Sequence, residues 1–155
     1  MDIPAVKACF DKVREHLSGL DIESIYMDGI GDPQVGETLR IRFPVTQDGN
    51  VVITELMVTS FLDDLDLMLM YSTVVVKIGD RYDELVQKLV PWNMNCPFGA
   101  YGIYEEGRQL YHKYSFPFPS DADPSDVAGQ VMVLLGVLHQ VLSEKYYEAE
   151  SYSVE

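Results

Sequence analysis

A hairpin pattern in the first third of the chain constrains the expected fold more than any other feature. Residues 38–45 alternate apolar and polar side chains, which predicts a strand with one buried face and one wet face. Asp48-Gly49 follows, a pair typical of tight hairpin turns because glycine accepts a positive φ without steric cost. Residues 51–62 then return as a second strand. We therefore expect an antiparallel sheet.

Similar patterns extend the sheet and add helices to it. Asp123-Pro124 is a strong helix start, because aspartate caps a helix and proline suits its first turn. The predicted strands are 21–27, 38–45, 51–62, 67–78, 99–104 and 109–118, and the predicted helices are 3–17, 82–90 and 124–147. The fold class is α+β, with an antiparallel, twisted sheet whose helices pack mainly against one face. Residues 1–147 form a single domain, and 148–155 form an acidic tail expected to be frayed.

Three local signals set the expected ends of these elements. Asp80 is placed to cap the middle helix. Pro91 makes continuation of this helix less favourable, although a kink into Trp92 stays open. Pro117 and Pro119 are expected to end the last strand, because proline has no N–H to donate to a neighbouring strand.

Charge excludes several classes of partner. The chain of 155 residues has a formal net charge of −14, which argues against binding nucleic acid or anionic lipid. The apolar run 127–142 contains polar residues and is expected to be too short to span a bilayer. Cys9 and Cys96 are too few for a disulfide framework, and residues 1–4 lack a signal-peptide pattern. We expect a cytoplasmic protein.

The residues with catalytic or metal-binding chemistry form no motif. His16, His112 and His139 fall on different predicted elements, and the two cysteines are widely separated. Asp63, Asp64 and Asp66 do not match a calcium loop that ends in a bidentate glutamate. We expect no cofactor, no metal and no catalytic residue.

The last helix carries apolar residues most of the way round. One sheet face cannot cover them all, so a second contact is expected, and we predict a homodimer. Two alternative faces of the helix remain open as the interface. They are Val131, Leu135 and Leu138, or Val133 and Val137 on the opposite side.

A second group of residues is predicted to bind a protein partner. The strand 67–78 is apolar on both faces, so one face is either covered or left for another molecule. Trp92 and the tyrosines of the hairpin that follows suit a core or an interface, where an aromatic ring needs one polar contact. The predicted partner-binding residues are Met68, Met70, Trp92 and Tyr101.

The order of elements resembles that of the YbjN family, labelled putative bacterial sensory transduction regulators. The resemblance rests on Trp92-Asn93 closing the middle helix, an aromatic hairpin with the turn Glu106-Gly107, and a long apolar last helix. It implies the fold of the small type III secretion chaperones, which are dimers that bind other proteins. It implies no catalytic residue.

These observations give one principal hypothesis for function and two alternatives. The principal one is a non-catalytic protein- or peptide-binding module of chaperone-like or regulatory type. The first alternative is a small-ligand sensor that uses the aromatic hairpin. The second is a hydrolase that uses loop carboxylates such as Asp64 and Asp66.

Overall fold

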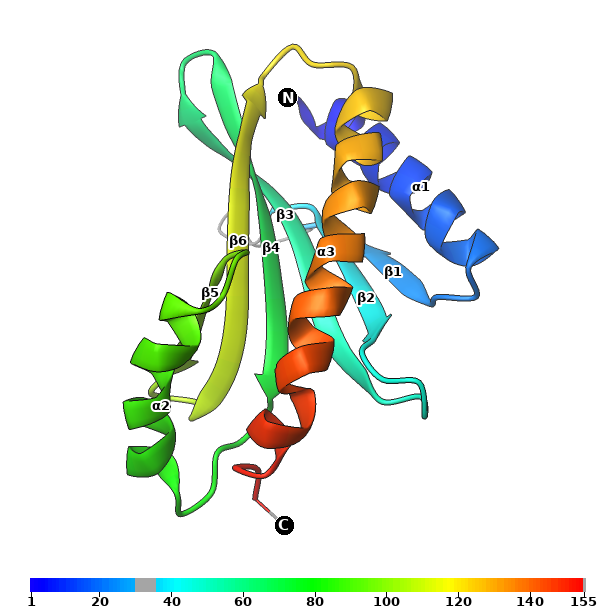
Figure 1. Cartoon of the computed structure of the whole chain (residues 1–155). Helices are drawn as coiled ribbons and strands as arrows, with labels where there is room; N and C mark the ends of the chain where they lie inside the picture. Colours follow the sequence, from blue (N-terminus) through cyan, green and yellow to red (C-terminus); the bar gives the residue numbers. More distant parts are fainter. Residues whose placement is uncertain (30–35, 155) are drawn as a thin grey trace.

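The protein is an antiparallel sheet with helices on one face, as the sequence predicted. The computed structural model describes residues 1–29 and 36–154. The strands form one six-stranded sheet in the order β1-β2-β3-β4-β6-β5, and each neighbouring pair is antiparallel (Figure 1). They are β1 (Ser24–Met27), β2 (Thr38–Pro44), β3 (Val51–Leu62), β4 (Leu65–Val75), β5 (Ala100–Tyr104) and β6 (Gln109–Pro119). The α+β class is confirmed.

The hairpin predicted for residues 38–62 forms as expected. β2 and β3 pair from Pro44–Val51 at the turn to Thr38–Met57 at the far end. Gly49 in the turn has φ +92°, a conformation that an L side chain rarely adopts. The predicted strand 51–62 matches β3, and Asp63 and Asp64 form the next turn.

β6 continues through two prolines that were expected to end it. Pro117 pairs with Leu67 and Pro119 with Leu65 of β4. β5 covers the other side of β6 only from Gln109 to Lys113, so beyond that point β6 is an edge. A proline whose missing N–H faces an open edge costs the ladder no hydrogen bond, so the strand continues.

Two of the helices, α1 and α3, begin at capping aspartates, and α2 departs from the prediction at both of its ends. Asp2 caps α1 (Ile3–Gly19), and the Asp123 side chain accepts a hydrogen bond from the N–H of Ser125 to cap α3 (Pro124–Glu150). α2 (Tyr82–Met94) has Arg81 at its cap position without a side-chain cap bond, so the expected cap Asp80 was wrong. α2 also continues through Pro91, which brings the next residue, Trp92, into the core.

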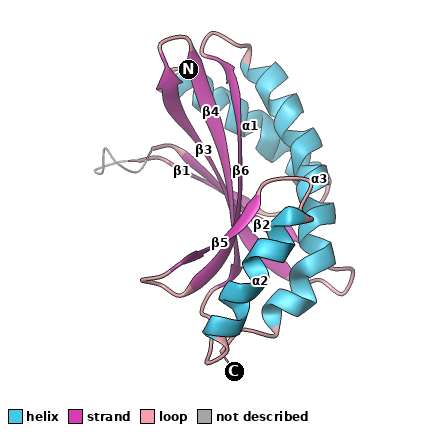
Figure 2. Cartoon of the chain, turned by 60° about the vertical axis from the view of Figure 1, so that its left-hand side comes forward, coloured by secondary structure: helices cyan, strands magenta, loops and turns pink. Residues whose placement is uncertain are grey.

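All of the helices lie on one side of the sheet (Figure 2). α1 packs beside the first half of α3, and the buried stripe of α3 lies over the sheet (Figure 1). The core lies between these layers and takes the inward-facing residues of the strands, including Leu39, Leu56 and Leu110. The opposite side of the sheet has no described helix over it.

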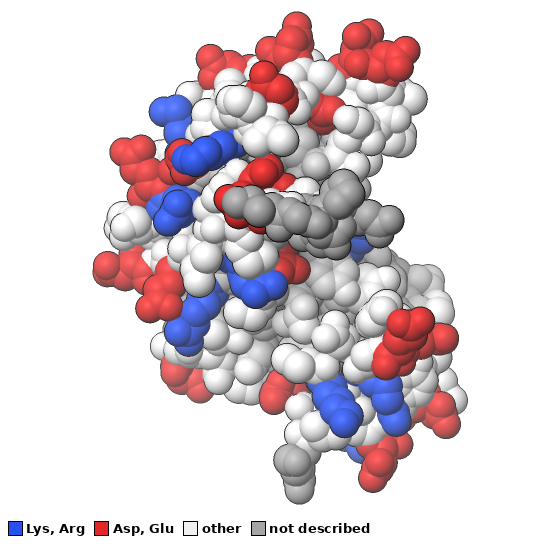
Figure 3. Space-filling model, turned by 180° about the vertical axis from the view of Figure 1, so that it is seen from behind, with Lys and Arg blue, Asp and Glu red and all other residues white. Residues whose placement is uncertain are grey.

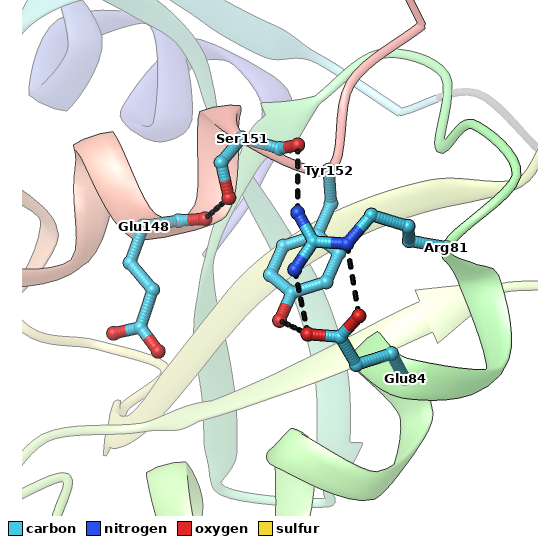
Figure 4. A network of polar contacts seen from close by, with 5 residues as sticks. All are labelled: Arg81, Glu84, Glu148, Ser151 and Tyr152. Atoms are coloured by element: carbon cyan, nitrogen blue, oxygen red, sulfur yellow. Dashed lines mark hydrogen bonds and ion pairs between the residues drawn. The ribbon is translucent and has the colours of Figure 1, made fainter.

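The C-terminal residues are anchored rather than frayed. Ala149 and Tyr152 are buried, and Ser153 makes a β-bridge with Ile78. Glu84 of α2 accepts hydrogen bonds from Arg81 and from the Tyr152 hydroxyl, and the Arg81 guanidinium lies over the Tyr152 ring (Figure 4). The boundary therefore differs from the predicted one at residue 148, because apolar burial, the bridge to Ile78 and the hydrogen bond from Tyr152 to Glu84 hold the segment.

By length and mean hydropathy, α3 is the one helix of the described residues that could cross a membrane. It is longer than the apolar run 127–142, which was expected to be too short to span a bilayer. In the structure its apolar stripe is buried against the sheet and α1, with Val131, Leu135 and Leu138 almost without solvent contact. That placement is typical of a core helix in a small water-soluble domain.

Candidate functional site

The partner-binding residues predicted on β4 face the core and not the solvent. Met68 is 0% exposed and Met70 is 1% exposed. Successive strand residues point to opposite sides, and the even-numbered residues of β4 point toward the helices. The prediction for Met68 and Met70 was therefore wrong. Their neighbours Leu67, Leu69 and Tyr71 occupy the other face.

Trp92 and Tyr101 also belong to the core. The two rings lie edge to face at 5.5 Å, and the Tyr101 ring meets the His112 ring at 5.1 Å. Lys145 of α3 lies over the Trp92 ring at 5.3 Å. Burial raises the pKa of Tyr101, and its hydroxyl has no described hydrogen-bond partner. These residues tie α2, β5 and β6 together, so their assignment to partner binding was wrong.

The strand face opposite the helices carries an apolar surface that we call the outer sheet face. It is centred on side chains that point away from the core and are partly exposed. They are Ile53, Met57, Leu67, Leu69, Tyr71 and Tyr111.

Strand register brings these side chains together. Met57 lies directly opposite Leu69 across β3 and β4. Tyr71 of β4 stacks on Tyr111 of β6 with ring centres 4.9 Å apart. The Tyr111 ring covers Gly102 of β5 so closely that a Cβ there would lie 2.5 Å from the ring. The surface is thus continuous from β3 to β5.

Charged residues border and interrupt this apolar surface, since Glu55 of β3 and Lys113 of β6 lie directly opposite Tyr71 on the same face. Figure 3 shows charged groups of both signs along the outline and also near the middle of this view, with uncharged surface between them. Arg40 lies on the outer sheet face and pairs with Glu55 at 2.7 Å, while Arg42 pairs with Glu23 at 3.1 Å. Each of these exposed pairs cancels its own charge. An antiparallel sheet covered on one face usually presents polar residues on the other, so this apolar surface is unusual.

The described edge beside β5 is closed to an added strand. The Asn93 side chain donates to the Tyr101 carbonyl at 2.9 Å and accepts from the Tyr101 N–H at 2.7 Å. The same side of the sheet continues along β6 past Lys113, where Pro117 and Pro119 supply no N–H. A partner is therefore better placed on the face of the sheet than along this edge.

Cys96 has a histidine neighbour that the sequence could not place. Its Sγ lies 3.9 Å from Nε2 of His112. The same Nε2 is 2.7 Å from the Phe98 carbonyl oxygen, which can only accept, so Nε2 holds a proton. It cannot then take the proton of the thiol. Burial also lowers the pKa of His112, so the pair does not match an activated thiol and its base.

The carboxylates offered for the hydrolase alternative do not converge. Asp66 lies in β4, is 3% exposed and pairs with the ammonium group of Met1. Asp63 and Asp64 are exposed at the β3–β4 turn. Across residues 1–29 and 36–154, no group of three or more histidines, cysteines or carboxylates is placed to hold a metal ion.

The structure separates the two faces of α3 that were open as a dimer interface. Val131, Leu135 and Leu138 are buried in the core, so that alternative was wrong. Val133 is 69% exposed and Val137 is 40% exposed. Part of the second contact predicted for α3 is therefore made within the monomer, by α1. Of the two candidate faces, the one with Val133 and Val137 stays open to another molecule.

No family matches the chain, and no curated protein matches it.

Proposed function

We propose that the chain is a non-catalytic binding module of chaperone-like or regulatory type, and that its outer sheet face holds an apolar segment of a partner protein. The observation that carries the proposal is the continuous apolar surface in which Met57 faces Leu69 and Tyr71 stacks on Tyr111. Large exposed apolar patches are rare on monomeric soluble proteins, and where they occur they commonly mark interaction sites.

Three features favour a protein segment as the occupant of this face. The surface follows several strands of the sheet, from β3 across β4 to β6, as an extended partner segment requires. On each strand, side chains of this face alternate with buried ones. The apolar residues of a partner segment that lies across the sheet would therefore contact one strand after another. The net charge of −14 keeps such a protein soluble while this surface is unoccupied.

The proposal includes the wider setting that the sequence suggested. The resemblance to the YbjN family supports a regulatory or chaperone-like role, in the cytoplasm. The exposed Val133–Val137 face of α3 supports a homodimer that leaves the outer sheet face free, because α3 lies on the opposite side of the sheet.

The test is affinity capture with paired variants. The double variant Met57→Thr, Leu69→Thr removes apolar area from the outer sheet face while keeping strand propensity. Val90→Thr makes a similar change at an exposed position of α2, outside both proposed interfaces, and serves as the control. A specific partner should be retained by the wild type and the control, and its affinity for the double variant should fall by about tenfold or more, since each lost side chain forfeits roughly 1 kcal/mol or more of burial.

Two results would count against this function. A partner that binds the double variant as tightly as the wild type would remove the outer sheet face from the proposal. A reproducible hydrolase turnover that disappears in Asp64→Asn would favour the enzyme alternative instead.

A further inference from the structure

A cavity of about 220 Å³ lies where the end of α1, the end of β2 and the middle of α3 meet. The buried side chains of Leu17, Phe43 and Leu135 contribute to its wall. The cavity is on the helix side of the sheet, away from the outer sheet face. The cavity is open to solvent on one side, where Leu20 is 63% exposed. Its volume is larger than the roughly 150 Å³ that holds a benzene ring, so a ring with a small substituent fits by size.

Gly136 of α3 lines the cavity and leaves it open. A Cβ added there would meet no atom within 4 Å, so the packing of the protein does not require a glycine. Glycine is unfavourable in the interior of a helix compared with alanine. The missing side chain has one evident structural consequence, which is open space beside the apolar wall.

Among the described residues that line this cavity, His139 has the one polar side chain, and it is exposed to solvent. Its Nδ1 lies 2.8 Å from the Pro44 carbonyl oxygen, and its ring meets Phe43 edge to face. A carbonyl only accepts, so Nδ1 carries a proton, and Nε2 of the neutral ring is an acceptor. No described residue donates to Nε2. A ligand that matches this wall is apolar and carries one hydrogen-bond donor.

The surroundings of His139 set the direction in which the polar end would point. His139 also lines a second, more polar hollow with Thr46, Asp48 and Tyr147. An apolar ring lying against Phe43 and Leu135 would therefore have its donor at the boundary with the polar hollow. That arrangement buries the ring and leaves the donor group paired, as a ligand site requires.

We propose that this cavity binds a free small aromatic molecule with one hydroxyl group, of the size of a substituted phenol. The ring packs among Leu17, Phe43 and Leu135, and the hydroxyl donates to Nε2 of His139. The proposal does not depend on the proposed function, because it concerns a different face and a different class of ligand.

The test uses para-cresol as the probe and toluene as its match without a donor. Methyl NMR signals of Leu17, Met132 and Leu135 should shift as para-cresol is added, while those of Leu67 and Leu69 should not. Toluene should bind at least severalfold more weakly. The absence of cavity shifts with para-cresol up to millimolar concentration would overturn the proposal, as would equal binding of toluene.

Two glycines of α3 provide matched variants. Gly136→Leu should abolish the para-cresol shifts by filling the cavity, whereas Gly129→Leu on the same helix should leave them unchanged. A Cβ at either position meets no atom within 4 Å, so both proteins should fold. If Gly136→Leu fails to fold, Met132→Phe fills the cavity from a neighbouring position. Unchanged para-cresol binding in a folded, filled variant would contradict the proposal.

Two further experiments test whether the phenol is a free molecule or a tyrosine side chain, and whether the cavity binds independently of the outer sheet face. N-acetyltyrosine amide carries the same phenol on a peptide unit, and it should bind more weakly than para-cresol. Binding as tight as that of para-cresol would overturn a free small molecule as the occupant. The variant Met57→Thr, Leu69→Thr should bind para-cresol normally, so failure of the outer sheet face and failure of the cavity can be distinguished.

Discussion

Gly99 shows how single residues hold the β5–β6 corner. It has φ +70°, and a Cβ there would lie 2.5 Å from the Lys113 carbonyl oxygen. Gly49 also has a positive φ, but a Cβ there would meet nothing within 4 Å. Gly99 is therefore required both by its positive φ and by the lack of room for a Cβ. Gly49 is required only by its positive φ.

We predict that Gly99→Ala lowers the free energy of unfolding by about 3 kcal/mol, and Gly49→Ala by about 1 kcal/mol. The larger loss comes from the clash with backbone that cannot move freely. Urea unfolding of both variants measures the two values. Equal losses would show that the space around Gly99 does not matter.

The side chain of Asn93 pairs with the edge of β5 in the way that the backbone of a neighbouring strand would. Its amide makes both a donor and an acceptor bond with the backbone of Tyr101. We predict that Asn93→Ala lowers the free energy of unfolding by about 2 kcal/mol, because part-buried backbone groups lose their partners.

The control for Asn93 lies two residues further along, at Asn95. Asn95 donates a single exposed hydrogen bond to the Pro91 carbonyl, so Asn95→Ala should cost less than about 1 kcal/mol. Hydrogen exchange at the Tyr101 amide should rise in Asn93→Ala and stay slow in Asn95→Ala. Slow exchange in both variants would contradict the role given to Asn93.

The burial of single residues was the part that sequence could not fix. β4 has apolar residues on both faces, so its pattern does not tell whether Met68 or Leu69 points to the helices. A shift of one residue exchanges the faces of a strand, and only the pairing with β3 and β6 decides between them. The presence of an apolar surface on this strand was predictable, but its residues were not.

At the scale of elements, local signals predicted strands better than helix ends. The alternation of apolar and polar residues predicted β2 and β3, because each of these strands has one buried face and one face in contact with solvent. α2 continued past Pro91 because burial of Trp92 outweighs the lost backbone bond. The ordered C-terminal segment depends on contacts with α2 and with Ile78, which sequence spacing does not reveal.

The contact between α2 and the C-terminal segment should depend on pH. Hydrogen bonds from Arg81 and Tyr152 lower the pKa of Glu84 from 4.5 to about 2. A lowered pKa in the folded state means that the carboxylate stabilises the fold fully above pH 4.5, and that this contribution is lost as the pH falls toward about 2.

Glu84→Gln tests this contact without changing the size of the side chain. The variant should be less stable than the wild type at neutral pH, and the difference should shrink as the pH falls below 4.5. Urea unfolding is measured down to the lowest pH at which both proteins remain folded. Raised salt should also reduce the difference, because the pair is exposed. A difference that does not change with pH would contradict the assignment.

At the scale of the whole molecule, the sequence predicted the architecture because its signals agree. Alternating strands, turn residues and capped helices all favour one antiparallel sheet with helices on a single face, and this is observed. The candidate site could not be predicted in the same way, because it depends on which face the helices leave uncovered. The cavity beside Gly136 depends on α1, β2 and α3 meeting in space.

The homodimer is predicted to use the exposed face of α3. Val133→Asp should give a monomer mass by light scattering at tens of micromolar, where the wild type gives a dimer, because a charge in an apolar interface loses its water. Val90→Asp on α2 is the control, since Val90 is 67% exposed and Val133 is 69% exposed. A monomer mass for the wild type would remove the prediction.

The most direct test of the binding module is photo-crosslinking from the outer sheet face. A photoreactive phenylalanine analogue replaces Tyr71, which lies at the centre of that face, and in a second protein it replaces Val90 on α2. We predict a defined protein adduct in native lysate from position 71, which decreases when unlabelled wild-type protein is added and is absent from position 90. No competed adduct at position 71, or the same adduct from both positions, would contradict the account.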